Sequence, residues 1–117
     1  MERLLRATIN TWHGLRYALS SEAAFRQELI VLLLAVPLAF IVATDTWKRF
    51  LLIGVVVFVM VVELLNTAIE KLADRLTLDR DPQIGRVKDM GSAAVGVALL
   101  MGATFWVFAL AERMGLI

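Results

Sequence analysis

Residues 50–70 read FLLIGVVVFVMVVELLNTAIE, an apolar run that contains two carboxylates and one amide. The run is long enough for a helix that crosses a lipid bilayer, which needs roughly 20 residues. At about 100° per residue, Glu63, Asn66 and Glu70 share one face of this helix. Asp74 lies one turn further along the same face. Because ionised side chains at lipid depth are costly without a partner or a function, these acids are candidates for chemistry.

The composition also indicates a membrane protein. Hydrophobic residues make up 60% of the 117 residues, and the mean hydropathy is +0.77, which exceeds what a small soluble domain can bury. We therefore predict an all-α integral membrane protein with a single membrane domain over residues 1–117, because no linker or repeat divides the chain. A net charge of +1 gives no indication of a nucleic-acid partner, and the absence of Cys excludes thiolate metal sites.

Three segments are apolar enough to span a bilayer, at about 29–47, 50–69 and 90–111. Residues 71–89 are predicted to form a loop between the second and third spans. Before the first span, residues 1–21 are predicted to form an amphipathic surface helix. Its apolar residues recur at helical spacing: Leu5, Ile9, Trp12, Leu15 and Leu19. Ser20 or Ser21 could cap the next helix.

Basic residues predict the orientation in the membrane. Four Lys or Arg residues precede the first span and five lie between Lys71 and Lys88, against two in the first loop and one near the carboxyl end. Because cytoplasmic segments carry the excess of positive charge, the amino terminus and the 71–89 segment are predicted to be cytoplasmic. The candidate acids then lie on the side of the membrane that holds ATP. Glu22 and Glu70 could bind a divalent ion with a nucleotide if their helices pack together.

Three segments, taken in order, resemble the prokaryotic diacylglycerol kinase family, and more closely its Gram-negative type. They are Glu22-Ala-Ala-Phe-Arg-Gln-Glu28, Val62-Glu-Leu-Leu-Asn-Thr-Ala-Ile-Glu70 and Lys88-Asp-Met-Gly-Ser-Ala-Ala-Val95. The resemblance implies a homotrimer of three-span chains in the cell inner membrane, with sites shared between subunits. It also implies transfer of the γ-phosphate of ATP to diacylglycerol, with Mg²⁺ as the cofactor. The chain has neither a P-loop nor a Gly-rich-loop kinase motif.

The resemblance also implies a role for each matching position. Glu63 resembles the general base, with Asn66 as a supporting polar residue in the catalytic site. Glu22 and Glu70 resemble ligands of Mg²⁺. The positions that match the nucleotide site are Arg3, Asn10, Glu22, Glu70, Asp79, Arg80, Asp81, Lys88 and Asp89. The positions that match the lipid site are Arg3, Trp12, Arg16, Glu28, Glu63 and Ser92.

Some positions depart from the family pattern. His13 stands where a Lys is expected, and Asn10 stands where an aromatic residue is expected. Residues 79–81, Asp-Arg-Asp, replace an acid followed by a pair similar to Tyr-His. We expect these differences to change the affinity for the nucleotide and to leave the chemistry intact.

Two alternative functions are compatible with the sequence. Undecaprenol kinases belong to the same family and phosphorylate another lipid alcohol. A small proton-coupled multidrug transporter would also have about this length and a membrane-embedded glutamate. The transporter is disfavoured because its essential acid would lie in the first of four helices, whereas three spans are predicted here.

Overall fold

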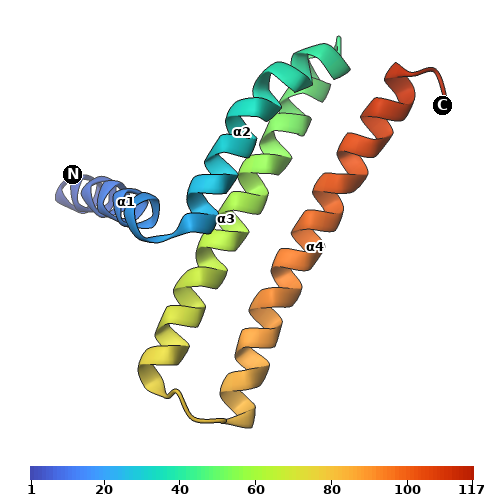
Figure 1. Ribbon diagram of the computed structural model, residues 1–117. Coiled ribbons are helices and arrows are strands. Elements are labelled where there is room, and N and C mark those ends of the chain that lie inside the picture. The colour runs from blue at the N-terminus through green and yellow to red at the C-terminus, as the bar shows by residue number, and fades with distance from the viewer.

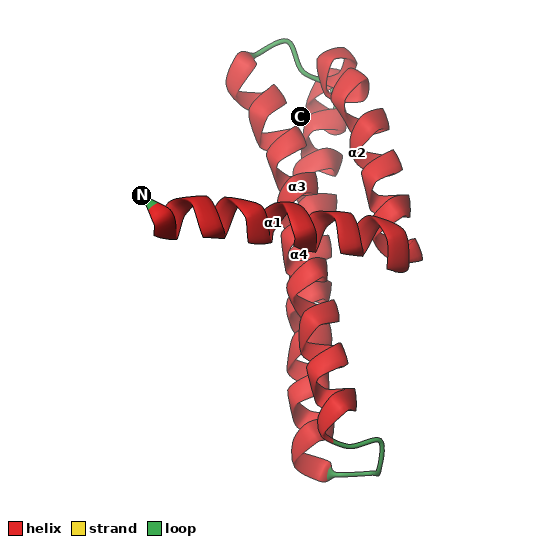
Figure 2. Cartoon of the chain, turned by 90° about the vertical axis from the view of Figure 1, so that its left-hand side faces the viewer, coloured by secondary structure: helices red, strands yellow, loops and turns green.

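The computed structural model describes all 117 residues as four α-helices joined by short connections. The helices are α1 (Glu2–Ser21), α2 (Ala23–Val42), α3 (Thr46–Leu76) and α4 (Pro82–Arg113). Helices α2, α3 and α4 lie side by side, whereas α1 projects sideways from the bundle (Figure 1). Figure 2 shows α1 running across the direction of the other three helices.

Helices α2, α3 and α4 are each long and apolar enough to cross a membrane. Only 12 of the 117 residues are buried, and large apolar side chains are exposed along all three helices. Water-soluble monomers rarely leave such extensive apolar surfaces uncovered. The chain is therefore a multi-pass membrane protein whose long helices are covered by lipid or by other protein, as the composition predicted.

The first predicted span, 29–47, is wrong at its carboxyl end. Helix α2 ends at Val42, and Thr46 and Trp47 already belong to α3. The Asp45 carboxylate accepts a hydrogen bond from the backbone N–H of Lys48 at 3.3 Å and so caps α3. The turn is polar, with Thr44, Asp45 and Thr46, so the sequence contained a signal for this boundary that the prediction passed over.

The predicted loop, 71–89, is much shorter in the structure. Helix α3 continues to Leu76 and α4 begins at Pro82, so only residues 77–81 connect them. Pro82 is favoured at the first position of a helix, where its missing N–H has no intrahelical partner. The Asp81 carboxylate caps α4 by accepting from the N–H groups of Gln83 and Ile84. The prediction placed the loop where the composition becomes polar. Both helices continue into this polar part of the sequence, so the change in composition does not mark their ends.

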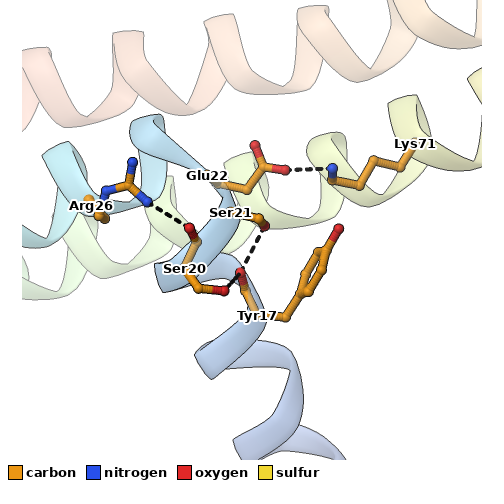
Figure 3. A network of polar contacts seen from close by, with 6 residues as sticks. All are labelled: Tyr17, Ser20, Ser21, Glu22, Arg26 and Lys71. Carbon is orange, nitrogen blue, oxygen red and sulfur yellow. Dashed lines mark hydrogen bonds and ion pairs between the residues drawn. The ribbon is translucent and has the colours of Figure 1, made fainter.

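The cap predicted for the start of α2 is also wrong. Ser20 and Ser21 lie in the last turn of α1, and both hydroxyl groups donate to the backbone oxygen of Tyr17 (Figure 3). The residue at the start of α2 is Glu22, whose extended backbone separates α1 from α2. The corner between the two helices is therefore a single residue.

Two small apolar clusters hold the three long helices together. In the cluster near the α2–α3 turn, Ala39 and Leu52 are buried and Trp106 of α4 packs against them. The indole N–H of Trp106 donates to the backbone oxygen of Leu52 at 3.1 Å. In the second cluster, near the α1–α2 corner, Phe25 packs with Met60 of α3. The small residues let α2 approach α3 closely, which places the polar face of α3 beside the other helices.

Candidate functional site

The polar face of α3 forms as its spacing predicted. The side-chain amide of Asn66 donates to the carboxylate of Glu70 at 2.8 Å, one helical turn along α3. Glu63 and Asn66 are half-buried, whereas Glu70 is exposed. The hydrogen bond fixes the orientation of the Asn66 amide and one oxygen of Glu70.

Helix α4 approaches α3 closely at Asn66. Gly91 of α4 is buried, and a Cβ built at this position would overlap the Oδ1 atom of Asn66. This Oδ1 atom is buried and accepts no hydrogen bond within the chain. Gly91 therefore makes room for the amide, and the amide retains one free acceptor.

A second acid lies on α2. Glu28 is half-buried and lines one groove with Met60 of α3, which lies one turn before Glu63. The Oε2 atom of Glu28 is buried and has no hydrogen-bond partner. A carboxylate with an unused oxygen atom can accept a hydrogen bond from a hydroxyl group.

Glu28 lies at the edge of this groove, which is open and apolar and runs between α2, α3 and α4. The groove has a volume of about 580 Å³, and 11 of its 13 lining residues are hydrophobic. Leu34, Val59 and Trp106 are among these residues, and Glu28 is the acid among them. The groove therefore suits a molecule with a long apolar part and one polar group.

The α1–α2 corner contacts α3 through an ion pair. The Lys71 ammonium lies 2.7 Å from the Glu22 carboxylate (Figure 3). It also lies 5.6 Å from the centre of the Tyr17 ring, within the range of a cation–π interaction. Lys71 follows Glu70 directly in α3, so this ion pair brings the Glu22 carboxylate to the same part of α3.

Lys88 of α4 makes a second ion pair at this end of the bundle. Its ammonium lies 2.5 Å from the carboxylate of Asp74 on α3. It also borders a hollow of about 370 Å³ beside the 77–81 connection, together with Asp79, Arg80 and Asp81. The structure thus brings together four nucleotide-site residues predicted from the sequence.

The remaining predicted residues lie apart from this cluster. Four of them are exposed on α1, which projects from the bundle: Arg3, Asn10, Trp12 and Arg16. Asp89 and Ser92 are exposed on α4. A single chain therefore does not gather all the residues that were predicted for one site.

The acidic residues suit a metal ion that arrives with a phosphate ligand. No group of three or more Asp, Glu or His side chains could hold a metal ion by itself. Mg²⁺ bound with a nucleotide uses one or two carboxylates, because phosphate and water oxygens supply the other ligands. Glu22 and Glu70 offer two such carboxylates, and Lys71, the residue after Glu70, forms an ion pair with Glu22. This set of oxygen donors fits Mg²⁺ with a nucleotide and does not fit a metal held by protein alone.

A family model described as prokaryotic diacylglycerol kinase matches residues 9–110, which include all of the polar face. The chain belongs to the prokaryotic diacylglycerol kinase family. Among its relatives, the diacylglycerol kinase of Escherichia coli is 44% identical over 113 residues, covering 97% of this chain and 93% of the relative. The diacylglycerol kinase of Pseudomonas aeruginosa is 41% identical over 106 residues, covering 91% of this chain and 86% of the relative.

A third relative from the diacylglycerol kinase family is also similar over most of the chain. The diacylglycerol kinase of Haemophilus influenzae is 36% identical over 106 residues, covering 91% of this chain and 90% of the relative. The family resemblance inferred from the three motifs is therefore confirmed. The transporter alternative is disfavoured by this membership and by the number of candidate spans, which is three rather than four.

Three residues that shape the site were not predicted from the sequence. Lys71 forms an ion pair with Glu22, and the Tyr17 ring lies beside the Lys71 ammonium. Gly91 makes room for the Asn66 amide. The position of Lys71 directly after Glu70 was a possible signal, but its partner is 49 positions away in the chain, which no local pattern reveals.

Proposed function

We propose that this protein is a diacylglycerol kinase, which transfers the γ-phosphate of ATP to the primary hydroxyl group of 1,2-diacylglycerol. The products are phosphatidic acid and ADP. The observation that carries the proposal is the buried Oε2 atom of Glu28, which has no hydrogen-bond partner and belongs to the one acid that lines the apolar groove. A lipid with apolar chains and one hydroxyl group has the chemistry that this arrangement accommodates.

In this proposal, Glu63 accepts the proton of the lipid hydroxyl group as the oxygen attacks the γ-phosphate. Asn66 holds Glu70 through its amide and keeps a free oxygen on the polar face. Glu28 orients the lipid before the reaction by accepting from the same hydroxyl group, which is the only hydrogen-bond donor of diacylglycerol. We also assign to the lipid site the other positions that the sequence resemblance implies, which are Arg3, Trp12, Arg16 and Ser92.

The nucleotide would bind at the cytoplasmic end of the bundle. Glu22 and Glu70 would hold Mg²⁺, which neutralises phosphate charge during the transfer. Lys88 would release Asp74 to contact a phosphate group. We also assign to the nucleotide site the other positions that the sequence resemblance implies, which are Arg3, Asn10, Asp79, Arg80, Asp81 and Asp89.

We further propose that the active form is a homotrimer whose sites are shared between subunits. The position of α1 supports this proposal, because this helix projects from the bundle (Figure 1) and exposes Arg3 and Trp12. A neighbouring subunit could supply them, which would make assembly a requirement for catalysis. The extensive exposed apolar surfaces of the long helices also favour contacts between subunits.

The proposed location is the cell inner membrane, with the amino terminus and the active site in the cytoplasm. The distribution of Lys and Arg supports this orientation, since the amino-terminal segment and residues 71–88 carry 9 of the 12 basic residues. Helix α1 would lie at the membrane surface as an amphipathic helix, with its arginine residues directed to the lipid head groups.

The test is transfer of phosphate from ATP labelled in its γ-phosphate to diacylglycerol in mixed micelles that contain Mg²⁺. Wild type is expected to produce labelled phosphatidic acid. Glu63→Gln keeps the size of the side chain but removes the base, and should lower kcat by about 10²- to 10⁴-fold. Glu70→Gln should also lower activity, and the matched control Lys48→Gln, which removes an ion pair with Glu112 elsewhere in the bundle, should retain it.

Undecaprenol is the comparison substrate in the same assay. Preference for undecaprenol over diacylglycerol would indicate an undecaprenol kinase and contradict the proposed substrate. Transfer to neither lipid would contradict the proposed enzyme, and a pH gradient coupled to cation transport would then support the transporter.

A further inference from the structure

Lys71 binds the corner between α1 and α2 through two different contacts. Its ammonium forms the 2.7 Å ion pair with Glu22 and lies over the ring of Tyr17. Both contacts are drawn together in Figure 3, where the Lys71 side chain extends from α3 toward the Glu22 carboxylate. The ammonium therefore has a defined position in the chain without nucleotide.

This position is next to one of the two carboxylates that the proposed function assigns to Mg²⁺, that of Glu22. Lys71 contacts Glu22 directly and follows Glu70 in the chain. A phosphate group held by a metal ion between these two carboxylates would come within reach of the Lys71 ammonium. The side chain has four flexible methylene groups and three donors, so it can reorient toward such an anion.

We propose that Lys71 is a nucleotide-binding residue, which exchanges the Glu22 carboxylate for an oxygen of the nucleotide phosphates when the nucleotide binds. This inference rests on the proposed function, because it takes Glu22 and Glu70 as the metal ligands. In the free chain, Glu22 neutralises Lys71 and positions its ammonium. In the complex, Glu22 binds the cation and Lys71 binds the anion, so each charge keeps an opposite partner.

The exposure of the ion pair allows this exchange. The side chain of Lys71 is 48% exposed, whereas that of Glu22 is 25% exposed. Water can therefore solvate the ammonium as it leaves the carboxylate, and exposed ion pairs contribute little to stability. A divalent cation on Glu22 would also repel the ammonium, whereas a phosphate group would attract it. Both changes favour transfer of Lys71 from Glu22 to the nucleotide.

The test is equilibrium binding of ATP, ADP and AMP to the full chain in detergent with excess Mg²⁺, measured by calorimetry without lipid substrate. Lys71→Gln keeps a hydrogen-bond donor for Glu22 but removes the charge. We expect its Kd for ATP to rise by about tenfold or more, since a hydrogen bond between charged groups is lost. The Kd for AMP should change much less, because AMP lacks the phosphate groups that the metal ion bridges. Lys71→Arg should bind ATP nearly as tightly as wild type.

Lys48→Gln is the matched control, because it removes an exposed ion pair with Glu112 at a distance from the corner. Its affinity for all three nucleotides should equal that of wild type. Equal weakening of ATP and AMP by Lys71→Gln would indicate a purely structural tether and would overturn the inference. Unchanged ATP affinity would overturn it as well.

The binding experiment on Lys71 can fail or succeed independently of the proposed kinase activity. If wild type binds ATP but phosphorylates no lipid, the diacylglycerol kinase assignment fails, and the Lys71 variants still report on the phosphate contact. If wild type phosphorylates diacylglycerol and Lys71→Gln binds ATP normally, only the inference about Lys71 fails.

Discussion

The amide oxygen of Asn66 on α3 occupies the space that a side chain at Gly91 on α4 would need. The two residues are 25 positions apart in the chain, and their contact sets how closely α4 approaches the polar face of α3. Because Asn66 also donates to Glu70, Gly91 indirectly determines the orientation of a proposed metal ligand.

Gly91→Ala should therefore impair catalysis without unfolding the chain. The added methyl group would displace the Asn66 amide and weaken its hydrogen bond to Glu70. We expect kcat for diacylglycerol phosphorylation to fall by about tenfold or more, the effect of misplacing a group in the site. Thermal unfolding in detergent, measured on the same samples, would show whether the fold is retained.

Gly54→Ala is the matched control for this substitution. Gly54 also lies in a long helix, and a Cβ there would have no neighbour within 4 Å in the chain. Its activity should stay near that of wild type. Equal losses in the two variants would mean that alanine acts through the helices in general, and not through Asn66.

Glu28→Gln should affect the lipid substrate selectively. The change keeps the size of the side chain but removes an anionic acceptor at the edge of the apolar groove. We expect the KM for diacylglycerol to rise by about tenfold, as when a hydrogen bond to a charged group is lost. The KM for ATP should stay constant in the same steady-state assay. A rise in both constants would place Glu28 in the nucleotide site instead.

Trp106→Phe should destabilise the bundle. The substitution removes the indole N–H that donates to the backbone oxygen of Leu52, and so weakens the attachment of α4 to α3. The expected loss in the free energy of unfolding is about 1 kcal/mol. It can be measured by reversible unfolding in mixed micelles of rising denaturing-detergent content. Trp47→Phe is the control, because Trp47 is exposed and its indole donates no hydrogen bond; a comparable loss there would contradict the role of the Leu52 contact.

Substitutions at Asp81 can separate a helix cap from a nucleotide contact. Asp81 accepts from two backbone N–H groups at the start of α4, at 2.9 and 3.3 Å. Asp81→Asn keeps a good cap, whereas Asp81→Ala should lower stability by about 1 kcal/mol. If Asp81 acts only as a cap, the melting temperature will fall in Asp81→Ala and stay near that of wild type in Asp81→Asn. The Kd for ATP will then stay constant in Asp81→Asn. A changed Kd in Asp81→Asn would assign the carboxylate a direct role at the nucleotide.

Much of the fold could be predicted from the sequence, because it depends on local properties. The existence of three apolar helices follows from composition, and the shared face of Glu63, Asn66 and Glu70 follows from helical spacing. Helix boundaries were predicted less well. Residues 71–76 and 82–89 have a polar composition typical of a loop, yet they continue α3 and α4 as helices.

The sequence by itself determined the class of the protein, the three candidate spans and the family, which the matched motifs identify. Only the tertiary structure decided which residues meet: Glu22 with Lys71, Asp74 with Lys88, and Asn66 with Gly91. Such contacts join residues on different helices, so they depend on how each helix is rotated about its axis and on the length of each turn. A hydropathy pattern encodes neither quantity, because lipid-facing and helix-facing positions in a membrane protein are both apolar.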